Sequence, residues 1–89
     1  MTETEISKII SLDDFSKAKE ALDRVLADNP QDDSAYYCLG RVLWKFDKRS
    51  EALSAYNMAV KLNPESPARF ALEMGKSVFD FFNPDLLNP

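Results

Sequence analysis

The chain has 89 residues, with 11 basic and 15 acidic side chains and a formal net charge of −4. With no histidine, one cysteine and two glycines, it cannot build an internal disulfide, a Cys/His zinc site, a histidine-dependent triad or a glycine-rich phosphate loop. Because neither half of the sequence carries a basic block, we expect no nucleic-acid partner. We predict one small domain that is not an enzyme and needs no cofactor or metal.

Start and stop signals divide the chain into five predicted helices. Thr2 and Glu5 have the spacing of a capping box, and acids at positions 13, 14, 32 and 33 suit helix starts. Asparagine–proline pairs at 29–30, 63–64 and 83–84 end helices, because a residue before proline disfavours the helical conformation. The helices are expected at about 3–12, from 15 to the pair at 29–30, from the caps at 32–34 to about 46, at about 48–62, and from 67 to about 82.

The chain repeats itself at an offset of 34 residues. A fixed period of this length indicates stacked supersecondary units, here of two helices each. The residues that recur are Asp13, Ser16, Ala18, Ala21, Asn29 and Pro30, which return as Asp47, Ser50, Ala52, Ala55, Asn63 and Pro64.

One period, residues 33–66, resembles a tetratricopeptide repeat. The residues that carry the resemblance are Tyr36, Leu39, Gly40, Leu43, Ala52, Tyr56, Ala59 and Pro64. Residues 2–32 resemble a more degenerate copy, and residues 67–82 resemble the first helix of a third copy, displaced by one residue. The resemblance implies an all-α domain over residues 1–82, a short right-handed solenoid of antiparallel helical hairpins, followed by a tail at 83–89.

The resemblance also implies a non-catalytic protein-interaction module that binds a peptide or protein segment in its concave groove. In the third helix, the groove positions fall on Ser34, Tyr37, Arg41, Trp44 and Lys45, and in the displaced fifth helix on Leu72, Lys76 and Phe79. We predict that Tyr37, Arg41 and Trp44 form the centre of the groove, with Lys45 and Lys76 at its edge. Such a groove suits an acidic, partly apolar peptide. Packing of Trp44 as ordinary core between repeats remains the alternative.

The sequence supports neither a carboxylate clamp nor a reactive cysteine. Glu3, Ser7 and Cys38 occupy positions where tetratricopeptide domains that clamp a chaperone's C-terminal carboxylate need lysine or asparagine. Without a histidine to activate it, Cys38 is expected to be a buried, inert thiol. A small-ligand site in the groove is the less favoured alternative.

The first ten residues carry no long apolar run. We therefore expect neither a signal peptide nor a membrane partner, and we expect the protein to be cytoplasmic.

The C-terminal end is unusually apolar for the last helix of a repeat array. Its large apolar residues cannot all face one side of one helix, and exposed apolar patches usually mark an interface. We predict either a tail that turns at the Asn-Pro pair and covers the fifth helix, or a two-fold homodimer, which the open last helix favours. A self-assembling structural protein is therefore an alternative function. The residues concerned are Phe79, Phe81, Phe82, Leu86 and Leu87.

Overall fold

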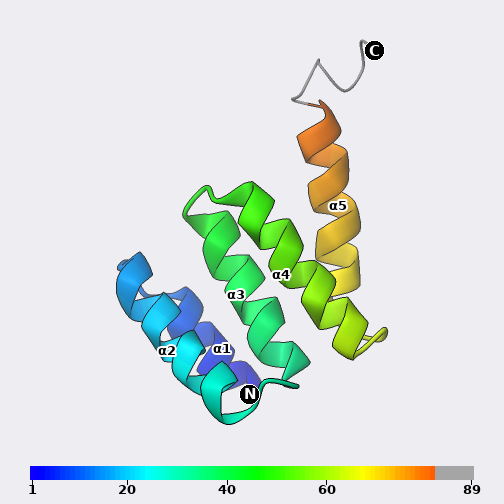
Figure 1. Ribbon diagram of the computed structural model, residues 1–89. Helices are drawn as coiled ribbons and strands as arrows, with labels where there is room; N and C mark the ends of the chain where they lie inside the picture. The colour runs from blue at the N-terminus through cyan, green and yellow to red at the C-terminus, as the bar shows by residue number, and fades with distance from the viewer. Residues whose placement is uncertain (82–89) are drawn as a thin grey trace.

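The described part of the chain folds as five helices in antiparallel hairpins. The computed structural model describes the backbone of residues 1–81 and the side chains of residues 1–74 (Figure 1). Its helices are α1 (Glu3–Ile10), α2 (Phe15–Asp28), α3 (Asp33–Lys45), α4 (Arg49–Leu62) and α5 (Ala68–Phe81). The predicted all-α fold and the number of helices in this part of the chain are confirmed. The tail at 83–89 lies outside the described residues.

Local side-chain contacts account for the starts of α1, α2 and α3. At α1, the Thr2 hydroxyl accepts from the Glu5 amide at 3.2 Å, and the Glu5 carboxylate accepts from the Thr2 amide at 3.3 Å, which completes the predicted capping box. The carboxylates of Asp14 and Asp32 each accept an amide of the first turn, at 3.2 Å, and so cap α2 and α3. One member of each acidic pair, Asp14 or Asp32, is therefore a helix cap.

α3 is the central helix of the fold. In Figure 1, α1 and α2 lie on one side of it, and α4 and α5 lie on the other. One core cluster contains Ala18, Leu22, Cys38 and Val42, which join α3 to α2. The second joins α3 to α4 and α5 and contains Leu43, Ala52, Ala55, Tyr56, Ala59, Ala68 and Leu72. Because α3 supplies residues to both clusters, the two hairpins stack around it.

The close crossing of α3 and α4 depends on Gly40. A Cβ atom at this position would lie 2.5 Å from Cδ1 and 3.0 Å from Cζ of Tyr56. The Tyr56 side chain is itself only 4% exposed, so its ring has little room to move. The missing side chain of Gly40 therefore lets the aromatic ring of α4 lie directly on the backbone of α3.

The turn between α3 and α4 is a Schellman motif. Asp47 has a positive φ of 64°, its amide donates to the Trp44 carbonyl at 3.1 Å, and the Lys48 amide donates to the Leu43 carbonyl at 2.8 Å. These bonds satisfy carbonyl groups that the end of a helix leaves without partners. The turn brings the start of α4 next to the last turn of α3, where Trp44 lies.

Helix α5 packs against α4 through one face only. Ala68 and Leu72 are buried in the second core cluster, at 0% and 8% exposure. Phe70 and Met74 are 71% and 70% exposed. Figure 1 shows α5 beside α4, with nothing of the described chain on its other side. None of the described helices is long and apolar enough to span a membrane.

Candidate functional site

The predicted centre of the groove lies on one side of α3. Tyr37 is half-buried, with its ring centroid 6.2 Å from that of Tyr56 on α4. Arg41, one helical turn further on, is exposed, and its guanidinium carbon lies 5.8 Å from the centroid of the Tyr37 ring. Within the described residues, no carboxylate forms an ion pair with Arg41. Its donors are thus held near an aromatic ring and remain available to an acceptor.

Trp44 packs against the core and also keeps part of its ring exposed. It is half-buried and packs against the core cluster between α3, α4 and α5. The guanidinium carbon of Arg49, at the start of α4, lies 5.3 Å from the centroid of its ring. The packing of Trp44 against the core is therefore confirmed, while the rest of the ring and Arg49 contribute to the same surface as Tyr37 and Arg41.

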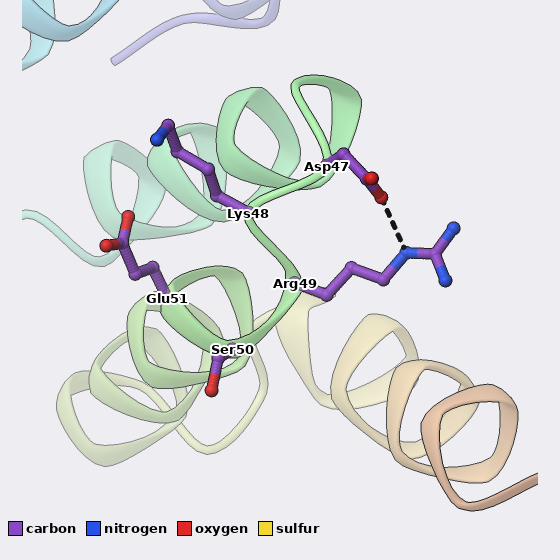
Figure 2. A pocket seen from close by; sticks show the side chains of 5 residues that line it. All are labelled: Asp47, Lys48, Arg49, Ser50 and Glu51. Carbon is purple, nitrogen blue, oxygen red and sulfur yellow. Dashed lines mark ion pairs between the residues drawn. The ribbon is translucent and has the colours of Figure 1, made fainter. Parts of the chain in front are cut away.

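The α3–α4 turn forms an open hollow of about 430 Å³ next to this surface. It is lined by Asp47, Lys48, Arg49, Ser50 and Glu51. Figure 2 shows the side chains of Asp47 and Arg49 together on one side of the turn, with Lys48 and Glu51 pointing to the other. The Asp47 carboxylate lies 3.2 Å from Nε of Arg49, and the Arg49 side chain is 42% exposed. Asp47 thus helps to hold Arg49 beside Trp44.

The sequence places Arg49 in the turn between two helices, where a basic residue is usually solvated, so Arg49 was not predicted to join this surface. It stands five residues after Trp44, across a change of helix, and only the turn brings the two side chains together.

Lys45 has partners inside the domain. Its ammonium donates to the carbonyls of Ile10, at 2.7 Å, and Leu12, at 3.0 Å, and lies 3.7 Å from the Asp13 carboxylate. It thereby ties α3 to the chain that follows α1. The binding role predicted for Lys45 stays a prediction, but its ammonium already satisfies backbone acceptors.

Of the residues predicted on the fifth helix, the structure tests only Leu72. Leu72, expected in the groove, is buried in the core against α4, so that prediction is wrong. Lys76 lies on α5, but its side chain is outside the described residues, so its predicted place at the groove edge stays a prediction. The predicted self-association residues, Phe79, Phe81, Phe82, Leu86 and Leu87, also lie outside the described side chains.

The titratable groups in the core do not suit catalysis. Burial raises the pKa of the Cys38 thiol to about 11, although the nearby Arg41 charge lowers it. Burial also raises the pKa of Tyr56 to about 12. Cys38 is therefore a protonated thiol at neutral pH, a poor nucleophile. Among the described side chains, no group of three or more acidic or cysteine residues could hold a metal ion.

The surface around α3 offers aromatic rings and guanidinium groups, a combination that dominates protein interfaces. It provides the two pairs Tyr37–Arg41 and Trp44–Arg49, which can receive carboxylates and apolar side chains. We name these four residues the aromatic–arginine surface.

Comparison with known proteins agrees with this architecture. A family model described as tetratricopeptide repeat matches residues 10–73. The solution NMR structure of Bacteroides fragilis protein BF1650 is 34% identical, with a TM-score of 0.84, over 99% of this chain and 91% of that chain. Among curated proteins, no match was found. Since the family model spans most of the sequence and a related structure has the same fold over nearly all of it, the chain belongs to the tetratricopeptide repeat family.

Proposed function

We propose that this protein is a non-catalytic interaction module that binds an acidic, partly apolar protein segment on the aromatic–arginine surface. Tetratricopeptide repeats generally mediate protein–protein interaction. The observation that carries the proposal is the pairing of each aromatic ring with an arginine: Arg41 with Tyr37 at 5.8 Å, and Arg49 with Trp44 at 5.3 Å.

The charges of these pairs favour an acidic partner. A guanidinium held over a ring loses less conformational freedom than a free one when it binds a carboxylate. Arg41 is exposed and has no acidic partner among the described residues, whereas Arg49 already contacts Asp47. We therefore expect Arg41 to contribute the main electrostatic contact, and Arg49 to orient Trp44 and add a weaker one.

The rings of the same surface explain the apolar part of the proposed partner. Tyr37 and Trp44 are half-buried, so they are already ordered by the core and lose little entropy on binding. Apolar side chains of the partner would cover the exposed parts of these rings. A small-ligand binder is less well supported, because the hollow beside the surface is a shallow, open depression at a turn.

Trp44 allows a direct test, because it is the only tryptophan of the chain. Peptides selected from a random display library on the full-length protein should be enriched in acidic and apolar residues. They should change the fluorescence of Trp44 on binding, and their affinity should fall as salt is raised, because exposed charges are screened beyond about 8–10 Å at ordinary ionic strength.

Matched variants separate this surface from general charge effects. Arg41→Gln should weaken binding of the selected peptides about 5–10-fold, the scale of one exposed charge-assisted contact of roughly 1 kcal/mol. Arg24→Gln removes the same charge from α2, where Arg24 pairs with Glu20 at 2.6 Å, and should leave binding unchanged. Peptides that bind Arg41→Gln as tightly as the parent and leave Trp44 fluorescence unaltered would refute the proposed site.

A further inference from the structure

Asp47, in the turn between α3 and α4, has a backbone conformation that glycine normally takes. Its φ of 64° is the one positive φ of a non-glycine residue in the described part of the chain. The left-handed conformation brings Cβ close to the following carbonyl oxygen, so glycine is usual at the end of a Schellman motif. Residues held in such conformations cluster at functional sites. The contacts of the Asp47 side chain show what an aspartate provides here that a glycine could not.

The carboxylate of Asp47 lies against Arg49. Its Oδ1 atom is 3.2 Å from Nε of Arg49, on the same side of the turn (Figure 2), and the guanidinium carbon lies 5.3 Å from the centroid of the Trp44 ring. The contact is loose, because Nε is buried without hydrogen-bond geometry to any described atom and the Asp47 side chain is 83% exposed. An exposed ion pair of this kind contributes little to stability and opens easily.

The aromatic–arginine surface therefore consists of two similar pairs, one with a carboxylate and one without. Asp47 shows that the Trp44–Arg49 pair accepts a carboxylate, whereas no carboxylate of the described residues forms an ion pair with Arg41. Tyr37 and Trp44 are seven residues apart on α3, so their positions share one face and are about 10 Å apart. Two carboxylate positions of the same kind thus lie about two helical turns apart.

We propose that Asp47 occupies, in the free protein, the place of a partner's acidic side chain. The bound segment carries two acidic side chains on one side, about 10 Å apart, the spacing of the two pairs. One pairs with Arg41, and the other displaces Asp47 from Arg49 into the solvent of the open hollow at the turn. A segment with a single acid binds at Arg41 only, because Asp47 repels it from Arg49. This inference rests on the proposed function and adds the number and spacing of the acids.

Asp47→Asn in the full-length protein tests the displacement. Asparagine has nearly the same shape and tolerates a positive φ, so the variant keeps the turn and loses only the charge. The probe is the tightest library-selected peptide with two acidic residues, together with its two derivatives in which one acid is replaced by the amide. Asp47→Asn should strengthen binding of the two-acid peptide about 2–5-fold, the scale of one exposed charge contact. The derivative that no longer responds to Arg49→Gln should change less than about twofold, because its remaining acid is screened from Asp47.

Two control variants separate displacement from the effect of net charge. Arg49→Gln removes the group that Asp47 occupies, so the gain from Asp47→Asn should vanish in that background. Asp23→Asn removes the same charge from α2, where Asp23 lies 3.2 Å from Lys19, and should leave binding unchanged. An equal gain from Asp23→Asn, or a gain that survives Arg49→Gln, would overturn the inference.

The remaining outcomes distinguish this inference from the proposed function. Weaker binding to Asp47→Asn would mean that Asp47 only orients Arg49, and would overturn the displacement. Selected peptides that depend on Arg41 but carry a single acid would also overturn it, and would leave the proposed function standing. A selection that yields no acidic peptides would refute both.

Discussion

Replacement of Gly40 tests the packing that defines the second repeat. An added Cβ would lie 2.5 Å from Cδ1 of Tyr56, whereas carbon atoms in favourable contact are about 3.5–4.0 Å apart. The ring must therefore move by roughly 1 Å, although it is 4% exposed and packs against Tyr37 on α3. Overpacking of this kind costs about 1–3 kcal/mol and occasionally more.

Two opposing effects decide whether Gly40→Ala stabilises or destabilises the protein. In an open helix, alanine is about 1 kcal/mol more favourable than glycine. Gly40→Ala thus sets a helix-propensity gain against the clash with Tyr56. Gly40→Leu adds three more carbon atoms to the same crossing, and we expect it to destabilise the protein by about 2 kcal/mol or more. This corresponds to a fall in the thermal midpoint of about 8–16 °C for a domain of this size.

The stability of both variants is measured by thermal and urea unfolding, followed by circular dichroism at the helix band. A second background, Tyr56→Leu, removes the ring that the new side chain meets. In that background, Gly40→Ala should raise the midpoint, because only the propensity gain remains. A Gly40→Leu variant that melts within a degree of the parent would refute the close crossing of α3 and α4. The same shift for Gly40→Ala in both backgrounds would refute the role of Tyr56.

Three further predictions follow from local structure. Asp47→Gly should stabilise the protein by about 1 kcal/mol, because glycine adopts the positive φ of 64° without strain, while Asp47→Ala should destabilise it. Equal urea midpoints for the two variants would contradict this prediction. Asp14→Ala should cost about 0.5–2 kcal/mol through loss of the α2 cap, and its exposed neighbour Asp13→Ala less than about 0.5 kcal/mol; comparable losses would argue against capping. Stability should fall as pH rises from about 10 to 12, because Tyr56 ionises near 10.0 in the unfolded chain and at about 12 when folded. Tyr56→Phe should reduce that fall, and an unaltered pH profile would contradict the buried hydroxyl.

Much of the fold follows from interactions within a few residues of each helix end, and these can be read from the sequence. Thr2, Asp14 and Asp32 cap helices because each side chain reaches the amide three residues ahead, wherever the helix lies. The period of 34 residues and the family resemblance single out Gly40 and Tyr56, but only the structure shows that the Tyr56 ring lies against Gly40. The family and the all-α fold could therefore be predicted, and both are confirmed.

The groove residues on α3 could be proposed from their spacing, but only the tertiary structure decided what surrounds them. Arg49 lies over Trp44 because the left-handed conformation of Asp47 reverses the chain between them. Lys45 bonds to carbonyls about 35 residues earlier, and no local pattern marks such a contact. On α5, a shift of one residue rotates the predicted face by about 100°. Leu72 is therefore buried against α4 and not in the groove, because a degenerate repeat leaves its register to be set by packing.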